Sequence, residues 1–153
     1  MKSVWRIAGG LMLPLLAAGP VLAQGQGLSA DTRQKLVASA AKGAAYLKQQ
    51  QRADGVFENH PGITAMAATA LLRQPGVPKA TAMTTAGKSL DALAKLAKPD
   101  GGIYEQAIPH YITAVSVMAF VAGERPQDKP LIEKGRKYLA DHLLDEGEGD
   151  DEA

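Results

Sequence analysis

Two histidines and two glutamates lie where apolar stretches of this sequence begin, and their side chains could do chemistry together. Glu58 and His60 precede one stretch, and Glu105 and His110 lie at the start of another. Imidazole and carboxylate groups bind metals, and they also transfer protons as general acids and bases. Their spacing matches no ligand motif. The structural alternative is that His60 caps its helix and His110 is a surface residue. The negative charges of the glutamates would then interact favourably with the partial positive charge at the helix N-termini. We therefore predict no metal site and no cofactor.

Two threonines occupy matching places, in Ile63-Thr64-Ala65 and Ile112-Thr113-Ala114. A hydroxyl on such a helix either faces a ligand or bonds a preceding carbonyl group. We expect these threonines, with the residues before the apolar stretches, to lie at the rim of a central cavity. The predicted rim residues are Glu58, His60, Thr64, Tyr104, Glu105, His110 and Thr113. None of them is assigned a catalytic role.

The elements that position these side chains follow a repeat of 46 residues. Lysines stand 46 apart (88 − 42 and 134 − 88), and leucines and glycines keep the same step. An acid precedes each glycine. A period of this size fits a pair of helices with two turns. The columns are Lys42, Lys88 and Lys134; Leu47, Leu93 and Leu139; Gly55, Gly101 and Gly147; and Asp54, Asp100 and Glu146.

Within each repeat an amphipathic helix alternates with an apolar one. Amphipathic helices are predicted near residues 29–51, 78–98 and 130–144, and apolar helices begin at Pro61 and Pro109, where a missing N–H does no harm. The inward stripe of the first helix is predicted to be Leu36, Ala40, Ala44 and Leu47. The pattern predicts an all-α fold with apolar helices inside and amphipathic helices outside. About two and a half hairpins are present, and the open alternative is a HEAT-like α-solenoid.

Both ends of the chain differ from this pattern. Residues 1–23 combine a basic start, an apolar run and small residues before Gln24, which is typical of a signal peptide. A retained N-terminal anchor is the alternative. Residues 24–144 are predicted to be the repeat domain, and residues 145–153 an acidic tail or a truncated loop. We expect an exported protein, periplasmic or secreted, with no membrane span after signal cleavage.

Composition narrows the classes of function. Residues 24–144 contain 15 Lys and Arg against 10 Asp and Glu, a balance of +5, whereas residues 145–153 contain six acids and no base. The basic residues are dispersed without interleaved aromatics, which argues against nucleic-acid binding. The sequence contains no cysteine, so packing must stabilise the fold and thiol chemistry is excluded.

The segment 42–57 resembles the QW motif of the terpenoid cyclase and protein prenyltransferase group. Gln51, Gly55 and Phe57 match the Gln-x-x-x-Gly-x-Trp spacing, with Phe in place of Trp. The second copy has Ala97, Gly101 and Ile103 at these positions, and the resemblance covers residues 30–149. It implies an α/α toroid, in which the motif's Gln and aromatic residue tie the end of an outer helix to the start of its neighbour. Their role is structural.

The resemblance does not include the residues on which the activities of the family depend. The Asp-x-Asp-Asp motif of squalene-hopene-type cyclases is absent, and the zinc site of prenyltransferases needs a cysteine. Family rings close with five to seven hairpins, so the chain is either an N-terminal fragment or closes its ring with other chains. We expect a non-catalytic binding or scaffold module for an apolar isoprenoid-like ligand or a protein. The alternative is part of an isoprenoid cyclase or transferase whose catalytic residues lie beyond residue 153. A sugar-processing enzyme that uses Glu58 and Glu105 ranks last.

Overall fold

The computed structural model describes residues 27–142 of the 153-residue chain, and these residues form helices joined by turns. The predicted signal peptide, the acidic tail and Gly147 lie outside the described residues. The prediction of an all-helical fold is confirmed for the described part, in which no strand occurs. The elements are α1 (Ala30–Gln50), α2 (Pro61–Leu72), α3 (Lys79–Ala94), α4 (Pro109–Gly123), the short 3₁₀ helix η1 (Pro126–Asp128) and α5 (Lys129–Asp141). None of these helices is long and apolar enough to cross a membrane.

Local sequence accounts for most helix starts. The hydroxyl of Ser29 accepts a hydrogen bond from the backbone N–H of Thr32 at 3.1 Å and so caps α1. Pro61 and Pro109 occupy the first positions of α2 and α4, as predicted. The prediction for α3 was wrong at its end, because the helix stops at Ala94 rather than near Lys98. The chain there turns back, and an isolated antiparallel bridge joins Ala97 to Ile103.

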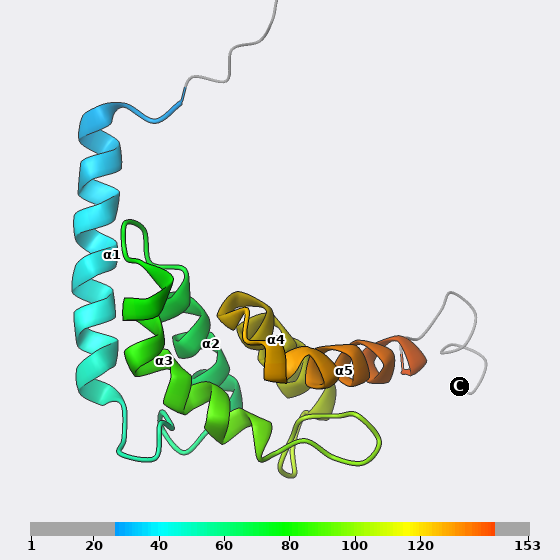
Figure 1. Cartoon of the computed structure of the whole chain (residues 1–153). Helices are drawn as coiled ribbons and strands as arrows, with labels where there is room; N and C mark the ends of the chain where they lie inside the picture. The colour runs from blue at the N-terminus through cyan, green and yellow to red at the C-terminus, as the bar shows by residue number, and fades with distance from the viewer. Residues whose placement is uncertain (1–26, 143–153) are drawn as a thin grey trace, which may run out of the picture.

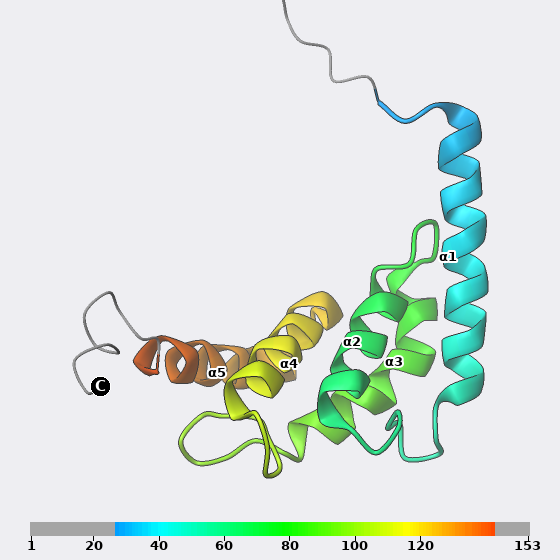
Figure 2. The same ribbon diagram turned by 180° about the vertical axis from the view of Figure 1, so that it is seen from behind.

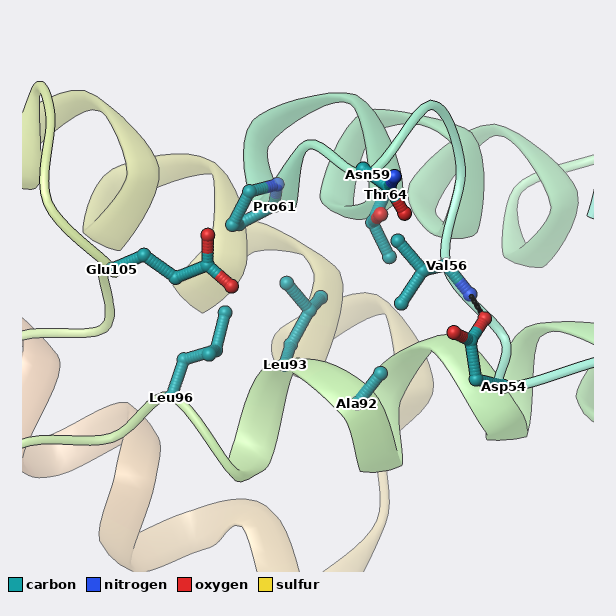
Figure 3. A pocket seen from close by; sticks show the side chains of 9 residues that line it. All are labelled: Asp54, Val56, Asn59, Pro61, Thr64, Ala92, Leu93, Leu96 and Glu105. Atoms are coloured by element: carbon teal, nitrogen blue, oxygen red, sulfur yellow. Dashed lines mark hydrogen bonds between the residues drawn. The ribbon is translucent and has the colours of Figure 1, made fainter. Parts of the chain in front are cut away.

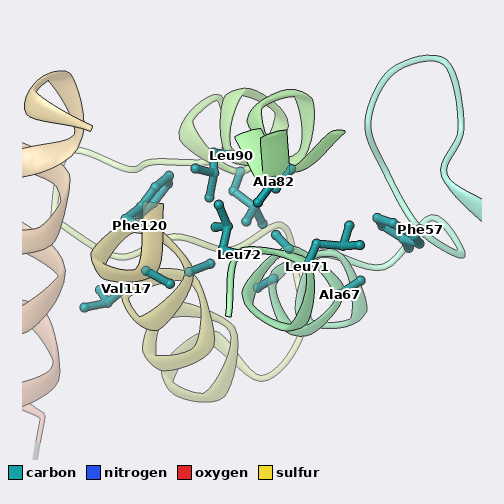
Figure 4. Close-up of a cluster of buried hydrophobic side chains, with 14 of the residues drawn as sticks. Phe57, Ala67, Leu71, Leu72, Ala82, Leu90, Val117 and Phe120 are labelled. Carbon is teal, nitrogen blue, oxygen red and sulfur yellow. The ribbon is translucent and has the colours of Figure 1, made fainter. Parts of the chain in front are cut away.

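The two apolar helices lie at the centre of the arrangement. α2 packs against α4, α3 packs against both, and the outermost helices α1 and α5 pack on α2 and α4 respectively. Figures 1 and 2 show α1 and α5 at opposite ends of this row of helices. Figure 4 shows the core between α2, α3 and α4, where Leu71, Leu72, Leu90 and Phe120 are buried together.

Two predictions about burial were only partly right. Of the four residues in the predicted inward stripe of α1, Ala44 alone is buried, and Leu36 is 52% exposed, because no described element covers the N-terminal half of this helix. The apolar helices were predicted to lie inside. Most of their residues are buried, but each helix also has an exposed apolar face, formed by Ile63, Met66, Tyr111, Met118 and Val121.

The turn that follows the amphipathic helix has the same structure in both described repeats. Arg52 donates its backbone N–H to Val56 at 3.1 Å, and Lys98 donates to Gly102 at 2.8 Å, 46 residues later. In each turn the preceding aspartate accepts a backbone N–H two residues on. The 46-residue period is therefore a structural period in the described part of the chain.

Glycine is required in these turns for two reasons. Gly55 and Gly101 have φ of +87° and +94°, which side chains rarely adopt. A Cβ atom at Gly55 would lie 2.5 Å from the backbone of Lys88, and one at Gly101 would lie 2.7 Å from the carbonyl oxygen of Lys134. Each turn thus packs directly on the backbone of the next amphipathic helix, at the lysine of the repeat.

Gln51 joins the end of α1 to the middle of α3. Its side-chain amide donates to the carbonyl of Thr85 at 3.0 Å and to the hydroxyl of Ser89 at 2.9 Å. Ser89 in turn donates to the carbonyl of Gly55 at 2.6 Å. The resemblance implied a contact at the start of the neighbouring helix. The observed partners are acceptors in the middle of α3 because the turn at Gly55 crosses α3 there. Phe57, the aromatic residue of the motif, is buried in the core.

Candidate functional site

The predicted rim residues near the starts of α2 and α4 do not all lie in one place. His60 and Glu105 line one cavity of about 150 Å³, together with residues that include Asn59 and Ile112. Tyr104 and His110 belong instead to an aromatic cluster against α5. Glu58 is exposed with a φ of +50° and lines neither cavity of this region.

His60 caps α2. Its Nδ1 atom accepts hydrogen bonds from the backbone N–H groups of Gly62 at 3.1 Å and Ile63 at 3.4 Å. Nδ1 accepts these bonds through its ring lone pair. The side chain satisfies two N–H groups that the helix itself leaves without partners. This geometry is the structural role weighed above for His60.

Thr64 and Thr113 hold the turns onto the apolar helices. The hydroxyl of Thr64 accepts from the backbone N–H of Phe57 at 3.0 Å and donates to the carbonyl of His60 at 2.9 Å. The hydroxyl of Thr113 accepts from Ile103 at 2.9 Å, and Ile103 is the repeat equivalent of Phe57 (103 − 57 = 46). Both threonines are buried. Their hydroxyls are therefore occupied by the backbone.

A larger cavity of about 310 Å³ adjoins the one at His60, since Asn59, Pro61 and Glu105 line both. Figure 3 shows its apolar floor, made by Ala92, Leu93 and Leu96 of α3 and its end, and the carboxylate of Glu105 extending over it. Asp54 lies at the far side, where its Oδ1 atom bonds the N–H of Val56. The cavity combines an apolar floor with carboxylates on opposite sides.

Sequence reasoning missed a cluster of four aromatic rings where the loop before α4 and the first turn of α4 meet the end of α5. The ring of Tyr138 is stacked with His110, with centroids 5.5 Å apart, and lies 4.4 Å from His142 and 6.1 Å from Tyr104. The two histidine rings meet edge to face at 5.2 Å. A weak signal for this cluster is present in the sequence, because Tyr138 near the end of α5 and His142 just after it are four residues apart.

One carboxylate at the edge of this cluster has a perturbed pKa. The hydroxyl of Tyr104 donates to Asp100 at 2.7 Å, and this bond lowers the pKa of Asp100, with a smaller effect from the N–H of Gly102. The same bond raises the pKa of Tyr104. The ammonium group of Lys98 lies 5.7 Å from the centre of the Tyr104 ring. The Asp100 carboxylate is thus kept ionised.

Replacing Tyr104 with phenylalanine should raise the pKa of Asp100 towards the ordinary value of about 3.9. The reason is that the hydrogen bond that favours the charged form is removed. A lowered pKa stabilises the fold above the pKa of the unfolded chain, and this contribution disappears as the pH falls through the folded value. The wild-type chain should therefore have this contribution at neutral pH and lose it in acid, whereas Tyr104→Phe should have little of it to lose.

An NMR titration of the Asp100 carboxyl carbon measures this pKa directly. Tyr46→Phe is the matched control, because Tyr46 is an exposed tyrosine on α1 and should leave the titration unchanged. An unchanged Asp100 pKa in Tyr104→Phe would show that the hydrogen bond does not set it.

Between residues 27 and 142, no group of three or more His, Cys, Asp or Glu side chains could hold a metal ion. His60 and His110 lie in different side-chain groups, so the predicted set of two histidines and two glutamates is not brought together as one cluster. The polar side chains around these turns mainly cap a helix or bond the turn backbone. A cavity with carboxylates at its edge lies beside them.

A second candidate surface is apolar and lies between α2 and α4. A groove of about 240 Å³ is lined by Met66, Thr69, Ala70, Arg73, Val115 and Met118. Met66 and Met118 are each about half exposed, and the hydroxyl of Tyr111 contacts the sulfur of Met66 at 3.4 Å. Flexible methionine side chains adapt to ligands of irregular shape. The groove continues the exposed apolar face of the two central helices.

Comparison with known proteins adds no relative to this picture. No protein-family model, curated protein or solved structure matches the chain. The terpenoid cyclase-like resemblance therefore remains a prediction from the motif residues.

Proposed function

We propose that the chain is an exported, toroid-type helical repeat protein that binds an apolar isoprenoid-like ligand and does not transform it. The observation that carries this proposal is the exposed apolar face of α2 and α4 with its methionine-lined groove. Exposed apolar faces of this kind mark interaction sites in soluble proteins.

The polar side chains support a binding role over a catalytic one. His60 caps a helix, and the hydroxyls of Thr64 and Thr113 bond backbone groups of the turns. Side chains that are committed to such bonds position the apolar helices rather than react. The resemblance to the cyclase and prenyltransferase group supports an isoprenoid over another apolar ligand, because the apolar helices would line the ligand site in that fold.

Farnesol, a 15-carbon isoprenoid alcohol, is a suitable probe for this groove. In a chain labelled with ¹³C at the methionine methyl groups, we expect farnesol to shift the signals of Met66 and Met118. Met83 is the internal control, because it is partly buried against the core on α3 and lines no part of the groove. The shifts should saturate with farnesol and be smaller with a straight-chain alcohol of equal length.

Met118→Glu should weaken farnesol binding at least about tenfold, which corresponds to about 1.4 kcal/mol. A charge in the groove must lose its hydration when the ligand binds, whereas in the free protein this half-exposed side chain reaches solvent. Leu36→Glu on α1 is the matched surface control, because Leu36 is as exposed as Met118 and lines no part of the groove. Farnesol shifts that are equal at all three methionines, or conversion of farnesol to a product, would contradict the proposal.

A further inference from the structure

The groove between α2 and α4, here called the methionine groove, has a positive charge at one end. The residues of its first wall are spaced as i, i+3, i+4 and i+7, and they are Met66, Thr69, Ala70 and Arg73. Residues at this spacing share one face of a helix, and at 1.5 Å per residue the face is about 10 Å long. Among the described residues that line the groove, Arg73 alone is charged. The groove is therefore an apolar channel that ends at a guanidinium group.

A second cavity meets the groove at the same residue. It lies between α1 and the end of α2 and has a volume of about 490 Å³, and both Ala70 and Arg73 line it as well as the groove. We call it the α1–α2 cavity. Tyr46 and Gln74, whose side chains have hydrogen-bond donors, also line it, and its described lining contains no acidic residue. Donors without a competing carboxylate favour an anion at this junction.

The charge of Arg73 is not used by another described side chain. The ion pairs formed between residues 27 and 142 all involve other cations. At the end of α4, by contrast, Glu124 is paired with Lys79 at 2.8 Å. A base at the end of a helix interacts favourably with the C-terminal carbonyl groups, but this interaction does not require its side chain to line an apolar groove. The guanidinium of Arg73 is therefore available to a ligand.

A carboxylate is the anion that best matches a single guanidinium group. The planar group donates two parallel hydrogen bonds to the two carboxylate oxygens, and one positive charge balances one negative charge. An anion with several charges would need further cations, and the described lining of the two cavities supplies none besides Arg73. The apolar chain of the same ligand would lie between Met66 and Met118, where removal of its carbon atoms from water is favourable.

We propose that the ligand of the methionine groove is an amphiphile with a carboxylate head, which binds Arg73 where the groove meets the α1–α2 cavity. This inference rests on the proposed function, because it uses the same groove. It adds the charged group of the ligand and the residue that selects it.

Three probes with the same apolar chain and different heads test the charge preference. Farnesoic acid is negative, farnesol is neutral and farnesylamine is positive. Each is titrated into the full chain near neutral pH, below the concentration at which the probe aggregates. The ¹³C methyl signals of Met66 and Met118 report on the apolar chain, and the ¹⁵N signal of the Arg73 Nε atom reports on the head. We expect farnesoic acid to bind at least about tenfold more tightly than farnesol, because hydrogen bonds between charged groups are the stronger ones. Farnesylamine should bind least tightly, and farnesoic acid alone should shift the Arg73 signal.

Variants at Arg73 locate the head group. Arg73→Gln should weaken the binding of farnesoic acid at least about tenfold and change that of farnesol less than about twofold, because the charge is lost and the apolar walls remain. Arg73→Lys should be intermediate, since an ammonium group retains the charge without the planar fork. Lys48→Gln is the matched control, because Lys48 is an exposed base on α1 that lines neither cavity. Circular dichroism of Arg73→Gln should equal that of the wild type.

The outcomes separate the head group from the groove itself. Equal affinities for farnesoic acid and farnesol would overturn the carboxylate head and leave the proposed function standing. Equal losses in Arg73→Gln and Lys48→Gln would overturn it as well, because the preference would then follow net charge. Tighter binding of farnesyl phosphate than of farnesoic acid would assign a phosphate head in place of the carboxylate. If none of the probes shifts the signals of Met66 and Met118, the proposed function is wrong too.

Discussion

Replacing Gly55 with alanine should lower the free energy of unfolding by about 2–5 kcal/mol, about 1–2 from the left-handed backbone and about 1–3 from steric overlap. The φ of +87° disfavours any side chain, and the new Cβ would lie 2.5 Å from the carbonyl carbon and oxygen of Lys88. Backbone atoms cannot move aside as the end of a flexible side chain can. A small domain has about 5–15 kcal/mol in total, so this single methyl group should remove a large share.

Variants at two other glycines separate the contribution of backbone strain from that of steric overlap. Gly76→Ala has the same backbone strain, with a φ of +75°, but its Cβ meets nothing within 4 Å, so we expect a loss of about 1–2 kcal/mol. Gly43→Ala lies within α1 and has neither problem, so it should stabilise the helix by about 0.5–1 kcal/mol. Urea unfolding followed by circular dichroism gives all three values. A Gly55→Ala loss no larger than that of Gly76→Ala would show that the turn does not pack tightly on α3.

Replacing Arg125 with methionine should lower the free energy of unfolding by about 3–5 kcal/mol, because a buried carboxylate is left without its partner. Asp128 is 1% exposed, and Arg125 binds both of its oxygens, at 2.7 Å and 2.9 Å. The same guanidinium reaches Asp91 on α3 and so ties η1 to that helix. Burial lowers the pKa of Arg125, but the hydrogen bonds to Asp128 and Asp91 raise it by more, so the cation is retained.

The exposed pair Lys137–Asp141 is the control. Its two side chains are 75% and 50% exposed, so Lys137→Met should change the free energy of unfolding by less than about 1 kcal/mol. The double variant Arg125→Met with Asp128→Leu should recover much of the loss, because two apolar side chains can replace a buried ion pair. Thermal and urea unfolding measure both effects. A double variant as unstable as Arg125→Met alone would show that lost packing, and not an unpaired charge, causes the instability.

The sequence by itself determined the helices and the turns between them. Ser29 caps α1, prolines begin α2 and α4, and Asp54-Gly55 and Asp100-Gly101 build the same turn. These features depend on hydrogen bonds between residues a few positions apart and on the φ that each residue type allows, so a linear pattern contains them. The period of 46 residues follows from the same local rules.

Tertiary structure alone decided which side chains meet across those helices. The ring of Tyr138 contacts those of His110 and His142. Asp128 is buried with Arg125, and the repeat did not predict a charge there because the equivalent residue is Ala82.

The burial of the predicted α1 stripe also depended on tertiary structure. Periodicity marks an apolar face, but whether that face is covered depends on the element packed against it, and no described element covers Leu36. The predicted site divided for the same reason. His60 precedes Pro61 and caps α2, whereas His110 follows Pro109 inside α4 and packs on Tyr138 of α5, a position that is Ala92 in α3 (138 − 92 = 46).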